Sequence, residues 1–342
     1  MYDCSSSHSN AYLFVPGQAC LSCVPLLTTG QQNLVQCGFS SLSTRNTLAN
    51  YICHLSEGMK VKESLDRAER LNAAGAADAE YGVSPFSDLT PEEFRRKHLS
   101  GRFLGGSRAG RRPLLAAAAR PRRPGPLRLP AGLPARVDWR ERGVVTSVRN
   151  QADCGACWAF STVEVLESMN ALRTGNLTRL SVQQLIDCST NNLGCTGGDV
   201  CWALEWMAEN GVVPDKQYPL KLKDQACVLR STAGGVRLKS YRCAAMVGDE
   251  EGILRLLAIQ GPVAVGADAT SWQDYVGGII RFNCERELNH AVQIVGYDMT
   301  GAVPYYIVRN SWGTEFGLDG YLHVAVGSDL CGLSEEVGSI LV

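Results

Sequence analysis

The spacing of hydrophobic residues divides residues 133–342 into two parts with different periods. From residue 157 to 211 the apolar positions follow a helix, beginning with Phe160, Val163, Leu166 and Met169. From about residue 235 onward, short apolar runs alternate with turn residues, which is typical of strands. These runs cover residues 261–265, 291–297, 304–308 and 321–326. The pattern predicts a helical lobe followed by a sheet lobe, in an α+β fold.

Two segments of the helical part carry their own start and stop signals. Ser181 followed by Gln184 predicts a capping box that opens a helix over residues 182–187. Residues 200–210 are apolar on one side, and Gly211 supplies a C-terminal cap.

The first 132 residues differ from the rest in charge. They carry 16 Lys and Arg against 10 Asp and Glu, whereas residues 133–342 carry 17 against 24. Residues 101–132 are rich in proline, glycine and alanine and have no apolar period, which predicts an exposed linker that proteases cut easily. A nucleic-acid-binding tail is the alternative interpretation, but the regular interleaving of aromatic residues that stacking on bases requires is missing. The arginines of this linker are Arg102, Arg108, Arg111, Arg112, Arg120, Arg122, Arg123 and Arg128.

The segment with the most candidate chemistry is Cys154-Gly-Ala-Cys157-Trp158. Its second cysteine stands at the start of the predicted helix, where the helix dipole and unpaired N–H groups favour a thiolate. The alternative is a disulfide-rich loop whose cysteines all pair. Two residues further along favour a nucleophile, because His290 lies 133 positions after Cys157 and Asn310 lies 20 positions after His290.

These residue types fit covalent hydrolysis of a peptide bond, which needs a nucleophile, a base that later acts as an acid, and a group that orients the base. Cys157 and His290 would form a thiolate–imidazolium pair in which each charge stabilises the other. The Asn310 amide oxygen would accept the second ring N–H, and Trp312 would shield that hydrogen bond from water. The Gln151 side chain and the Cys157 backbone N–H would donate to the oxyanion.

Residues 133–342 resemble the mature domain of a papain-family, cathepsin-like cysteine protease, because residues 154–158 fit its signature C-G-[SA]-C-[WY]. The resemblance implies a papain-like two-lobe fold, with a helical lobe, a β-barrel-like sheet lobe, the active site in the cleft between them, and a helical pro-region before them. It implies a cysteine endopeptidase that forms a Cys157 thioacyl-enzyme, uses His290 as acid and base, and needs no cofactor or metal. The implied partners are protein and peptide substrates, the chain's own pro-region as inhibitor, and cystatin-type inhibitors. The implied protein is a monomer that binds neither nucleic acid nor membrane.

The expected pro-region lies before the linker, in residues 59–100. Gly82-Val-Ser84-Pro-Phe86-Ser-Asp88 resembles the family's G-x-N-x-F-x-D pattern, with Ser84 in place of the Asn. The helix expected upstream is only partly visible, over residues 63–72. We therefore expect an inhibitory segment, with a weaker or truncated one as the alternative. Cleavage in the linker would start the mature enzyme near Leu133, and charge complementarity between the two parts would make activation faster at acid pH.

The cysteines indicate an oxidising compartment, since nine of the 14 lie after residue 133. By resemblance, the disulfides are Cys154–Cys195, Cys188–Cys227 and Cys284–Cys331, which leaves Cys157 as the nucleophile. Cys201 and Cys243 lie outside this framework; they either pair with each other or stay buried as small apolar residues. Asn176-Leu177-Thr178 is a candidate glycosylation site.

The resemblance also implies where substrate binds. The backbone of Gly197 and Gly198 would pair with the extended substrate, since glycine permits a close approach. The pocket for the second residue before the scissile bond would contain two acids, Asp199 and Glu336. Either Glu336 makes this pocket accept Arg or Lys, or both carboxylates face solvent. The pocket's other members would be Val200, Gly266, Leu288 and Ala291.

Residues 1–58 fit no pattern and form an atypical N-terminal segment. They offer neither the basic start nor the continuous apolar stretch of a signal peptide, although the resemblance implies a lysosomal or secreted protein. No transmembrane run is present. Three alternatives remain: a transglutaminase-like enzyme, a catalytically silent binding protein on the same fold, and a misprocessed zymogen. A transglutaminase-like enzyme usually has an Asp third member and calcium sites, whereas the third member here is Asn310. A silent protein would most simply have lost Cys157, His290 or Gln151.

Overall fold

The computed structural model describes residues 21–25, 35–39, 47–74, 78–99, 129–229, 234–282 and 284–342, with side chains from residue 58 onward. Most of the predicted linker over 101–132, with all eight of its arginines, lies outside these residues. Among the described residues, no helix is both long and apolar enough to cross a bilayer.

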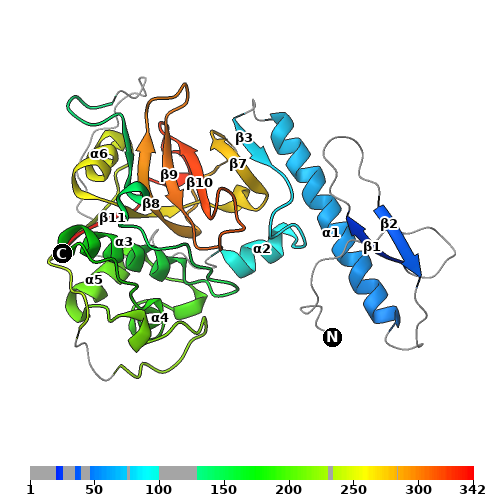
Figure 1. Cartoon of the computed structure of the whole chain (residues 1–342), viewed down its shortest axis with the longest axis horizontal. Coiled ribbons are helices and arrows are strands. Elements are labelled where there is room, and N and C mark those ends of the chain that lie inside the picture. The colour runs from blue at the N-terminus through cyan, green and yellow to red at the C-terminus, as the bar shows by residue number, and fades with distance from the viewer. Residues whose placement is uncertain are drawn as a thin grey trace.

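A nine-stranded sheet forms the scaffold of the C-terminal half (Figure 1). Its strand order is β3-β7-β10-β9-β8-β6-β11-β5, with β4 paired to β8. All pairings are antiparallel except that of β10 with β7. The strands are β3 (Ala79–Tyr81), β4 (Arg136–Asp138), β5 (Ser240–Ala244), β6 (Val263–Ala267), β7 (Tyr275–Ile280), β8 (His290–Asp298), β9 (Tyr305–Arg309), β10 (Tyr321–Ala325) and β11 (Val337–Leu341).

The four apolar runs seen in the sequence correspond to β6, β8, β9 and β10, at slightly shifted bounds. Five other strands of the sheet were not predicted, of which β3 lies before the linker and β4 just after it. In β7 and β11, glycines interrupt the apolar alternation, and in β5 most residues are exposed. Their pairing comes from neighbouring strands and not from their own pattern.

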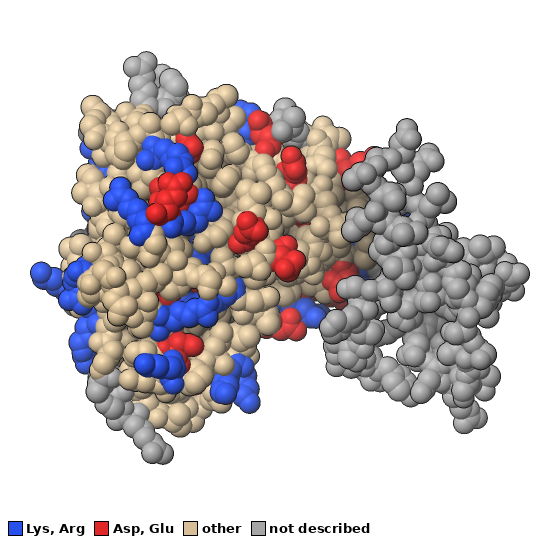
Figure 2. All heavy atoms as spheres, viewed as in Figure 1, with Lys and Arg blue, Asp and Glu red and all other residues tan. Residues whose placement is uncertain are grey.

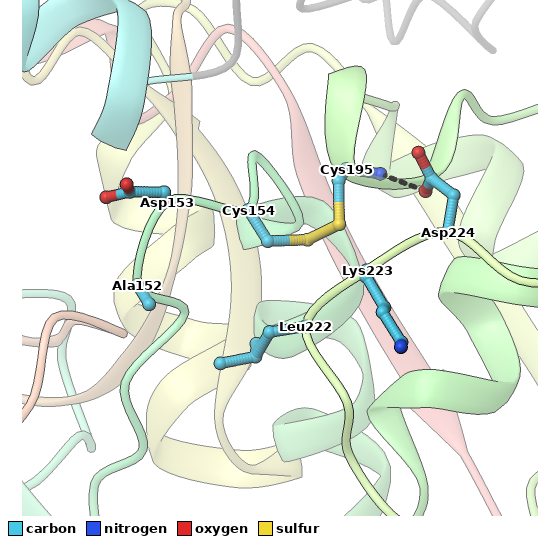
Figure 3. Close-up of a pocket in the computed structure, with 7 residues that line it drawn as sticks. All are labelled: Ala152, Asp153, Cys154, Cys195, Leu222, Lys223 and Asp224. Carbon is cyan, nitrogen blue, oxygen red and sulfur yellow. Dashed lines mark hydrogen bonds between the residues drawn. A yellow bond between two sulfur atoms is a disulfide. The ribbon is translucent and has the colours of Figure 1, made fainter. Parts of the chain in front are cut away.

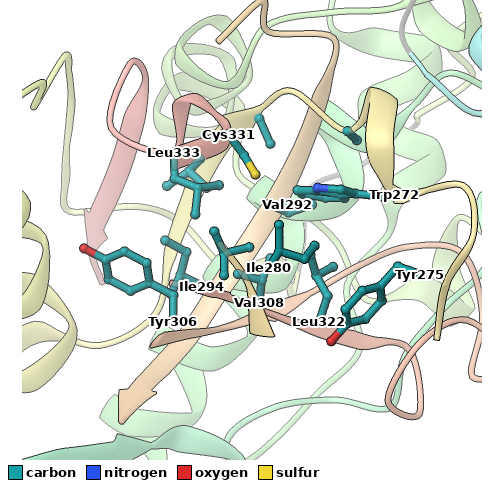
Figure 4. Packing of buried hydrophobic residues seen from close by; sticks show 14 of the residues in the cluster. Trp272, Tyr275, Ile280, Val292, Ile294, Tyr306, Val308, Leu322, Cys331 and Leu333 are labelled. Carbon is teal, nitrogen blue, oxygen red and sulfur yellow. The ribbon is translucent and has the colours of Figure 1, made fainter. Parts of the chain in front are cut away.

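The core of the sheet lobe consists of aromatic and β-branched residues that the strands direct to one side (Figure 4). Trp272, Tyr275 and Ile294 are fully buried in it. Burial of this apolar surface is the main force that holds the strands in register. The same core includes Phe86 and Phe94, so residues before the linker share it with the C-terminal half.

The helical lobe consists of α3 (Cys157–Thr174), α4 (Val182–Cys188) and α5 (Val200–Asn210), while α6 (Glu250–Arg255) belongs to the sheet lobe. α3 is buried on every side from Cys157 to Ala171, so it is a central helix of this lobe. α5 has the predicted bounds and ends at Gly211, whose φ is 72°.

The predicted capping box at α4 is only half present. Ser181 Oγ accepts from the Gln184 backbone N at 2.9 Å, as expected. The Gln184 side chain turns away and binds the backbone of Gly211 and Val213 instead. The prediction was wrong on this point because two distant backbone groups compete for the same amide.

The N-terminal part contains β1 (Leu21–Pro25), β2 (Val35–Phe39), α1 (Thr47–Ala74) and α2 (Pro91–His98). β1 and β2 pair antiparallel in a segment for which no fold was expected. The helix expected over residues 63–72 begins at Thr47, so it crosses the boundary that we placed at 58/59. α2 has the full capping box between Thr90 and Glu93.

The segment before the linker docks on the edge of the sheet through β3, which pairs with β7 (Figure 1). Ser64 Oγ and the Arg67 guanidinium donate to the buried carboxylate of Asp274, just before β7. Ser84 Oγ donates to the Gln273 carbonyl at 2.6 Å and accepts from the Phe86 N–H at 3.0 Å. Serine at position 84 therefore both caps a backbone N–H of its own turn and binds the C-terminal half.

Candidate active site

Cys157 is the first residue of α3, as the sequence predicts. Its side chain is buried, and it lies outside the disulfides of the described residues. The N-cap position before it is Ala156, whose side chain has no oxygen to cap the first N–H groups of α3. These groups and the helix dipole favour negative charge at the Cys157 sulfur.

His290 and Asn310 are brought together by the pairing of β8 with β9. His290 begins β8 and Asn310 directly follows β9, so antiparallel pairing places the two residues at the same end of the sheet. His290 Nε2 lies 2.8 Å from Asn310 Oδ1. Because Asn310 Oδ1 also accepts from the Ser311 backbone N, this atom is an acceptor and Nε2 carries the proton.

The second ring nitrogen, Nδ1, is the one left for proton exchange with a nucleophile. It makes no hydrogen bond to any described residue. α3 packs against β8, and Cys157 shares a buried cluster with Ala291, the residue after His290. The arrangement thus brings the thiol of one lobe and the imidazole of the other toward the same place.

Two tryptophans enclose the imidazole. The Trp312 ring lies 4.8 Å from the His290 ring, and Trp272 meets it edge-on at 6.1 Å. Both indoles are buried. Trp312 was expected to cover the site, whereas the contact of Trp272 was not predicted.

Burial lowers the pKa of His290 to about 4, although its bond to Asn310 opposes this shift. The imidazole is therefore neutral at pH 7 while the segment before the linker covers the site. The thiolate–imidazolium pair expected from the sequence stays a prediction. Exposure to solvent and a thiolate at Cys157 would both raise the His290 pKa.

Gln151 is fully buried, and its amide is oriented by a residue that the sequence analysis missed. Ser311 Oγ donates to Gln151 Oε1 at 2.6 Å. This leaves Gln151 Nε2 as a donor, which reaches Cys154 O at 3.1 Å and His98 O at 3.3 Å. The His98 carbonyl of the N-terminal segment thus accepts a hydrogen bond from the Gln151 amide, the group that was expected to stabilise an oxyanion.

A buried charge network lies beneath these groups and joins the two lobes. Arg149 pairs with Glu164 at 3.3 Å and with Glu167 at 2.9 Å. Arg309, next to Asn310, pairs with Glu164 at 3.2 Å. Burial raises the pKa of Glu164, while the two arginines oppose the shift. The network connects α3 to β9, the strand that ends at Arg309.

The structure contains the three disulfides that the resemblance implies, Cys154–Cys195, Cys188–Cys227 and Cys284–Cys331. A fourth, Cys201–Cys243, joins α5 to β5 and selects one of the two alternatives for these cysteines. Cys201, Cys243 and Glu336 lie close enough together to hold a metal ion, but their sulfurs form this disulfide and offer no thiolates. Asn176, the glycosylation candidate, is exposed just beyond α3.

The two glycines expected to bind substrate, Gly197 and Gly198, follow shortly after Cys195 of the Cys154–Cys195 disulfide. Gly197 has a φ of 135°, which disfavours any other residue. A Cβ at Gly198 would lie 2.5 Å from the Trp158 ring, so only glycine fits at this position. These contacts give Gly198 a packing role in addition to the expected one.

The expected specificity pocket draws together segments of both lobes. Gly266 is paired with Ala291, and its N–H donates to the Glu336 carbonyl at 3.0 Å. Val200, at the start of α5, is buried against the strand that follows Glu336. Leu288 is half-buried and lies close to Gly332.

The two acids of this pocket do not face solvent, so that alternative is wrong. Asp199 is the N-cap of α5 and accepts from the Trp202 N–H at 2.9 Å, which is a structural role. Glu336 is 2% exposed, and its Oε1 lies 2.8 Å from Cys201 Sγ. Glu336 therefore lies buried against the fourth disulfide.

A cavity of about 550 Å³ lies beside the catalytic segment, against the Cys154–Cys195 disulfide (Figure 3). Asp153 and Lys223 bring opposite charges to it, and Asp224 is held by the Cys195 N–H at 2.7 Å. Lys97, from the segment before the linker, reaches Asp153 at 3.8 Å.

Charge does not divide the described N-terminal segment from the C-terminal half. Residues 59–100 carry seven basic and eight acidic side chains, so the positive excess belongs to the linker. Basic and acidic side chains both occur across the face in Figure 2. The contacts run in both directions, with Arg67 on Asp274 and Arg281 on Asp78.

Comparison with known proteins agrees with this geometry. The family model for papain family cysteine proteases matches residues 133–341. Cathepsin O of Mus musculus is 43% identical over 298 residues, which cover 84% of this chain and 91% of that protein. Cathepsin O of Homo sapiens is 43% identical over 293 residues, covering 84% and 88%.

Solved structures of proenzymes have the same fold. Procathepsin L2 from Tenebrio molitor larval midgut matches with a TM-score of 0.73 and 30% identity, covering 89% of this chain and 96% of that one. The proform of Amb a 11, a ragweed pollen cysteine protease, matches with a TM-score of 0.72 and 30% identity, covering 84% and 88%.

Proposed function

This chain belongs to the papain family of cysteine proteases, and we propose that it is a cysteine endopeptidase made as a zymogen. The observation that carries the proposal is the His290–Asn310 pair at 2.8 Å, beside a buried cysteine at the N-terminus of α3. Endopeptidase cleavage is the default, because the sequence has no inserted loop that would block either end of the expected cleft.

In the proposed reaction, His290 Nδ1 takes the proton of the Cys157 thiol, and Sγ attacks the carbonyl carbon of the scissile bond. The tetrahedral oxyanion receives hydrogen bonds from Gln151 Nε2 and the Cys157 backbone N–H. His290 then gives a proton to the leaving amine, which leaves a thioacyl-enzyme. Water attacks this intermediate while His290 takes a proton, and the carboxylic acid product and the thiol are released. Asn310 orients the imidazole, and Ser311 orients the Gln151 amide.

The same contacts support a zymogen, with residues 59–100 as inhibitory pro-region. This segment covers the site, and its His98 carbonyl engages Gln151 Nε2. Activation would be cleavage in the linker near Leu133, favoured at acid pH, where carboxylates of the ion pairs begin to protonate. We expect the full chain to process faster near pH 4.5 than near pH 7. Equal rates at both pH values, at low and moderate salt, would remove charge as the cause.

For specificity, we propose that Glu336 makes the pocket tolerant of Arg or Lys at the second residue before the scissile bond. Its burial supports this role, since a buried carboxylate gains from an opposite charge. Dipeptide substrates ending in Phe-Arg and Arg-Arg would be compared in wild type and Glu336→Gln. A selective loss for Arg-Arg in the variant is expected. An unchanged ratio would assign recognition to other groups.

The remaining proposals follow from the family. They are a lysosomal or secreted location, an N-glycan at exposed Asn176, inhibition by cystatin-type proteins, and a monomeric enzyme. No observation favours a silent binding protein or a misprocessed zymogen.

The decisive assay is hydrolysis of a fluorogenic peptide by the processed enzyme, compared with Cys157→Ser and His290→Ala. Turnover in wild type that both substitutions abolish is expected. A correctly folded wild-type protein that binds the peptide without cleaving it would overturn the proposed function.

A further inference from the structure

His98 lies at the contact between the pro-region and the catalytic groups. It is the last residue of α2 and only 8% exposed. Its ring centroid lies 4.5 Å from that of Phe86, 5.7 Å from that of Phe94 and 6.5 Å from that of Trp312. Trp312 in turn covers the catalytic imidazole. The ring therefore belongs to an aromatic cluster, in which Phe86 and Phe94 come from the pro-region and Trp312 from the C-terminal half.

The backbone of His98 is tied to the catalytic machinery at the same time. Its carbonyl accepts from Gln151 Nε2 at 3.3 Å. Displacement of the His98 side chain would therefore also free the amide that we assign to the oxyanion. His98 thus links its ring contact with Trp312 to the hydrogen bond that occupies Gln151 Nε2.

Charges of both signs face the imidazole from the elements around it. Asp153 of the catalytic segment, Asp88 of the preceding turn and the Ala152 backbone favour the cation. Lys97 of α2 opposes it, and His290 lies behind Trp312. The Asp153 side chain is 68% exposed and lies 3.8 Å from Lys97, so both water and Lys97 weaken its influence.

We propose that His98 is a pH-sensitive latch of the zymogen. The neutral imidazole holds the end of α2 in the aromatic cluster and keeps the His98 carbonyl hydrogen-bonded to Gln151 Nε2. Protonation would place a charged imidazole among these aromatic rings, which is unfavourable. It therefore releases this end of the pro-region from the site. The inference rests on the proposed zymogen and names the residue that senses acid.

The sign of the effect follows from burial. Desolvation lowers the pKa of His98 in the docked state, despite the nearby carboxylates. The free pro-region has an ordinary histidine pKa of about 6.5. As pH falls below that value, the released state binds more protons than the docked state. Docking then weakens by up to about tenfold per pH unit, until the pH reaches the docked pKa.

The experiment uses the full chain carrying Cys157→Ser, which prevents self-cleavage. Opening is measured as hydrogen exchange of residues 79–99 between about pH 7.5 and 4.5, with β6 as internal reference. The variants are His98→Phe, which keeps an aromatic ring, and His98→Gln, which keeps polarity. His323→Gln is the matched control, because His323 is another partly buried histidine with a lowered pKa, and it lies on β10. With five histidines in the chain, NMR can also titrate His98 directly.

We expect opening of the parent to rise about fivefold from pH 6.5 to 5.5 and that of both His98 variants to stay nearly flat. His323→Gln should follow the parent. If either His98 variant opens along the parental curve, the latch is wrong. If both variants fail to close at pH 7.5, the NMR titration of the parent decides, and a His98 pKa at or above 6.5 overturns the proposal. Peptide hydrolysis by the processed enzyme tests the proposed function separately, since that form lacks His98.

Discussion

The ion pair between Arg67 and Asp274 should dominate the docking of the pro-region. Arg67 Nε and Nη2 lie 2.5 and 3.0 Å from the two oxygens of Asp274, whose side chain is 1% exposed. Removing one partner of a fully buried pair costs about 3–5 kcal/mol. Because the Arg67 side chain is 21% exposed, water compensates for part of the loss. We expect Arg67→Gln to weaken docking by about 2–3 kcal/mol, which is roughly 30–150-fold.

The chain offers a matched control on the same contact. Arg281 pairs with Asp78 between the same two parts, but these side chains are 43% and 24% exposed. Exposed pairs contribute about 0.2–1 kcal/mol. Arg281→Gln should therefore weaken docking by no more than about fivefold.

The assay is alkylation of Cys157 by an epoxide in the full-length zymogen at about pH 6.5. Its rate follows the fraction of open molecules, once it is normalised to the processed enzyme of the same variant. Because Arg67 is absent from the processed enzyme, the processed form of Arg67→Gln is identical to that of wild type and has the same labelling rate. If Arg67→Gln and Arg281→Gln accelerate labelling equally, burial of Asp274 does not control docking and the reasoning is refuted.

Three further predictions concern the mature half. Gln151→Ala should lower kcat/KM for peptide hydrolysis by about 10²–10³ through loss of one oxyanion donor; a drop below about tenfold would contradict that role. Glu167→Ala leaves Arg149 buried with one partner fewer, and urea unfolding should show a loss of about 3 kcal/mol. Glu141→Ala, at an exposed pair, should change stability little. His323 has a pKa lowered to about 4 by burial, below its unfolded value of about 6.5, so the unfolding free energy should fall as pH drops from 6.5 to 4. His323→Gln should remove that component, and an identical pH dependence in the variant would exclude it.

Much of the fold could be predicted because its signals are local. The helical period after Cys157 and the four apolar runs each lie within about a dozen residues. The candidate triad was found in the same way, because Cys157, His290 and Asn310 each stand at the end of such a pattern. The cap of α5 at Gly211 is equally local.

The rest depends on contacts between distant residues. Ser311 stands in the recognised Asn310-Ser311-Trp312 stretch, but its bond to Gln151 exists only because the two lobes meet. Residues 79–81 become a strand because the edge of β7 is open to them. His98 shows no motif at all; its position follows from the packing of α2 on Trp312.

The burial of Glu336 could not be predicted either. Its neighbourhood is set by the Cys201–Cys243 disulfide, a pairing that spacing alone left open. The half-formed capping box at Ser181 has a related cause, because Gln184 finds backbone partners in a segment that folds back from beyond α5. In each case a local rule was overridden by a tertiary partner.

The most direct test of the central claim is the site of covalent labelling in the processed enzyme. A peptidyl epoxide that alkylates active-site thiolates should add one equivalent, and mass spectrometry of the digest should place it on Cys157. Cys157→Ser should take up none, although the disulfides remain. Labelling elsewhere, or equal labelling of Cys157→Ser, would contradict a nucleophile at the N-terminus of α3.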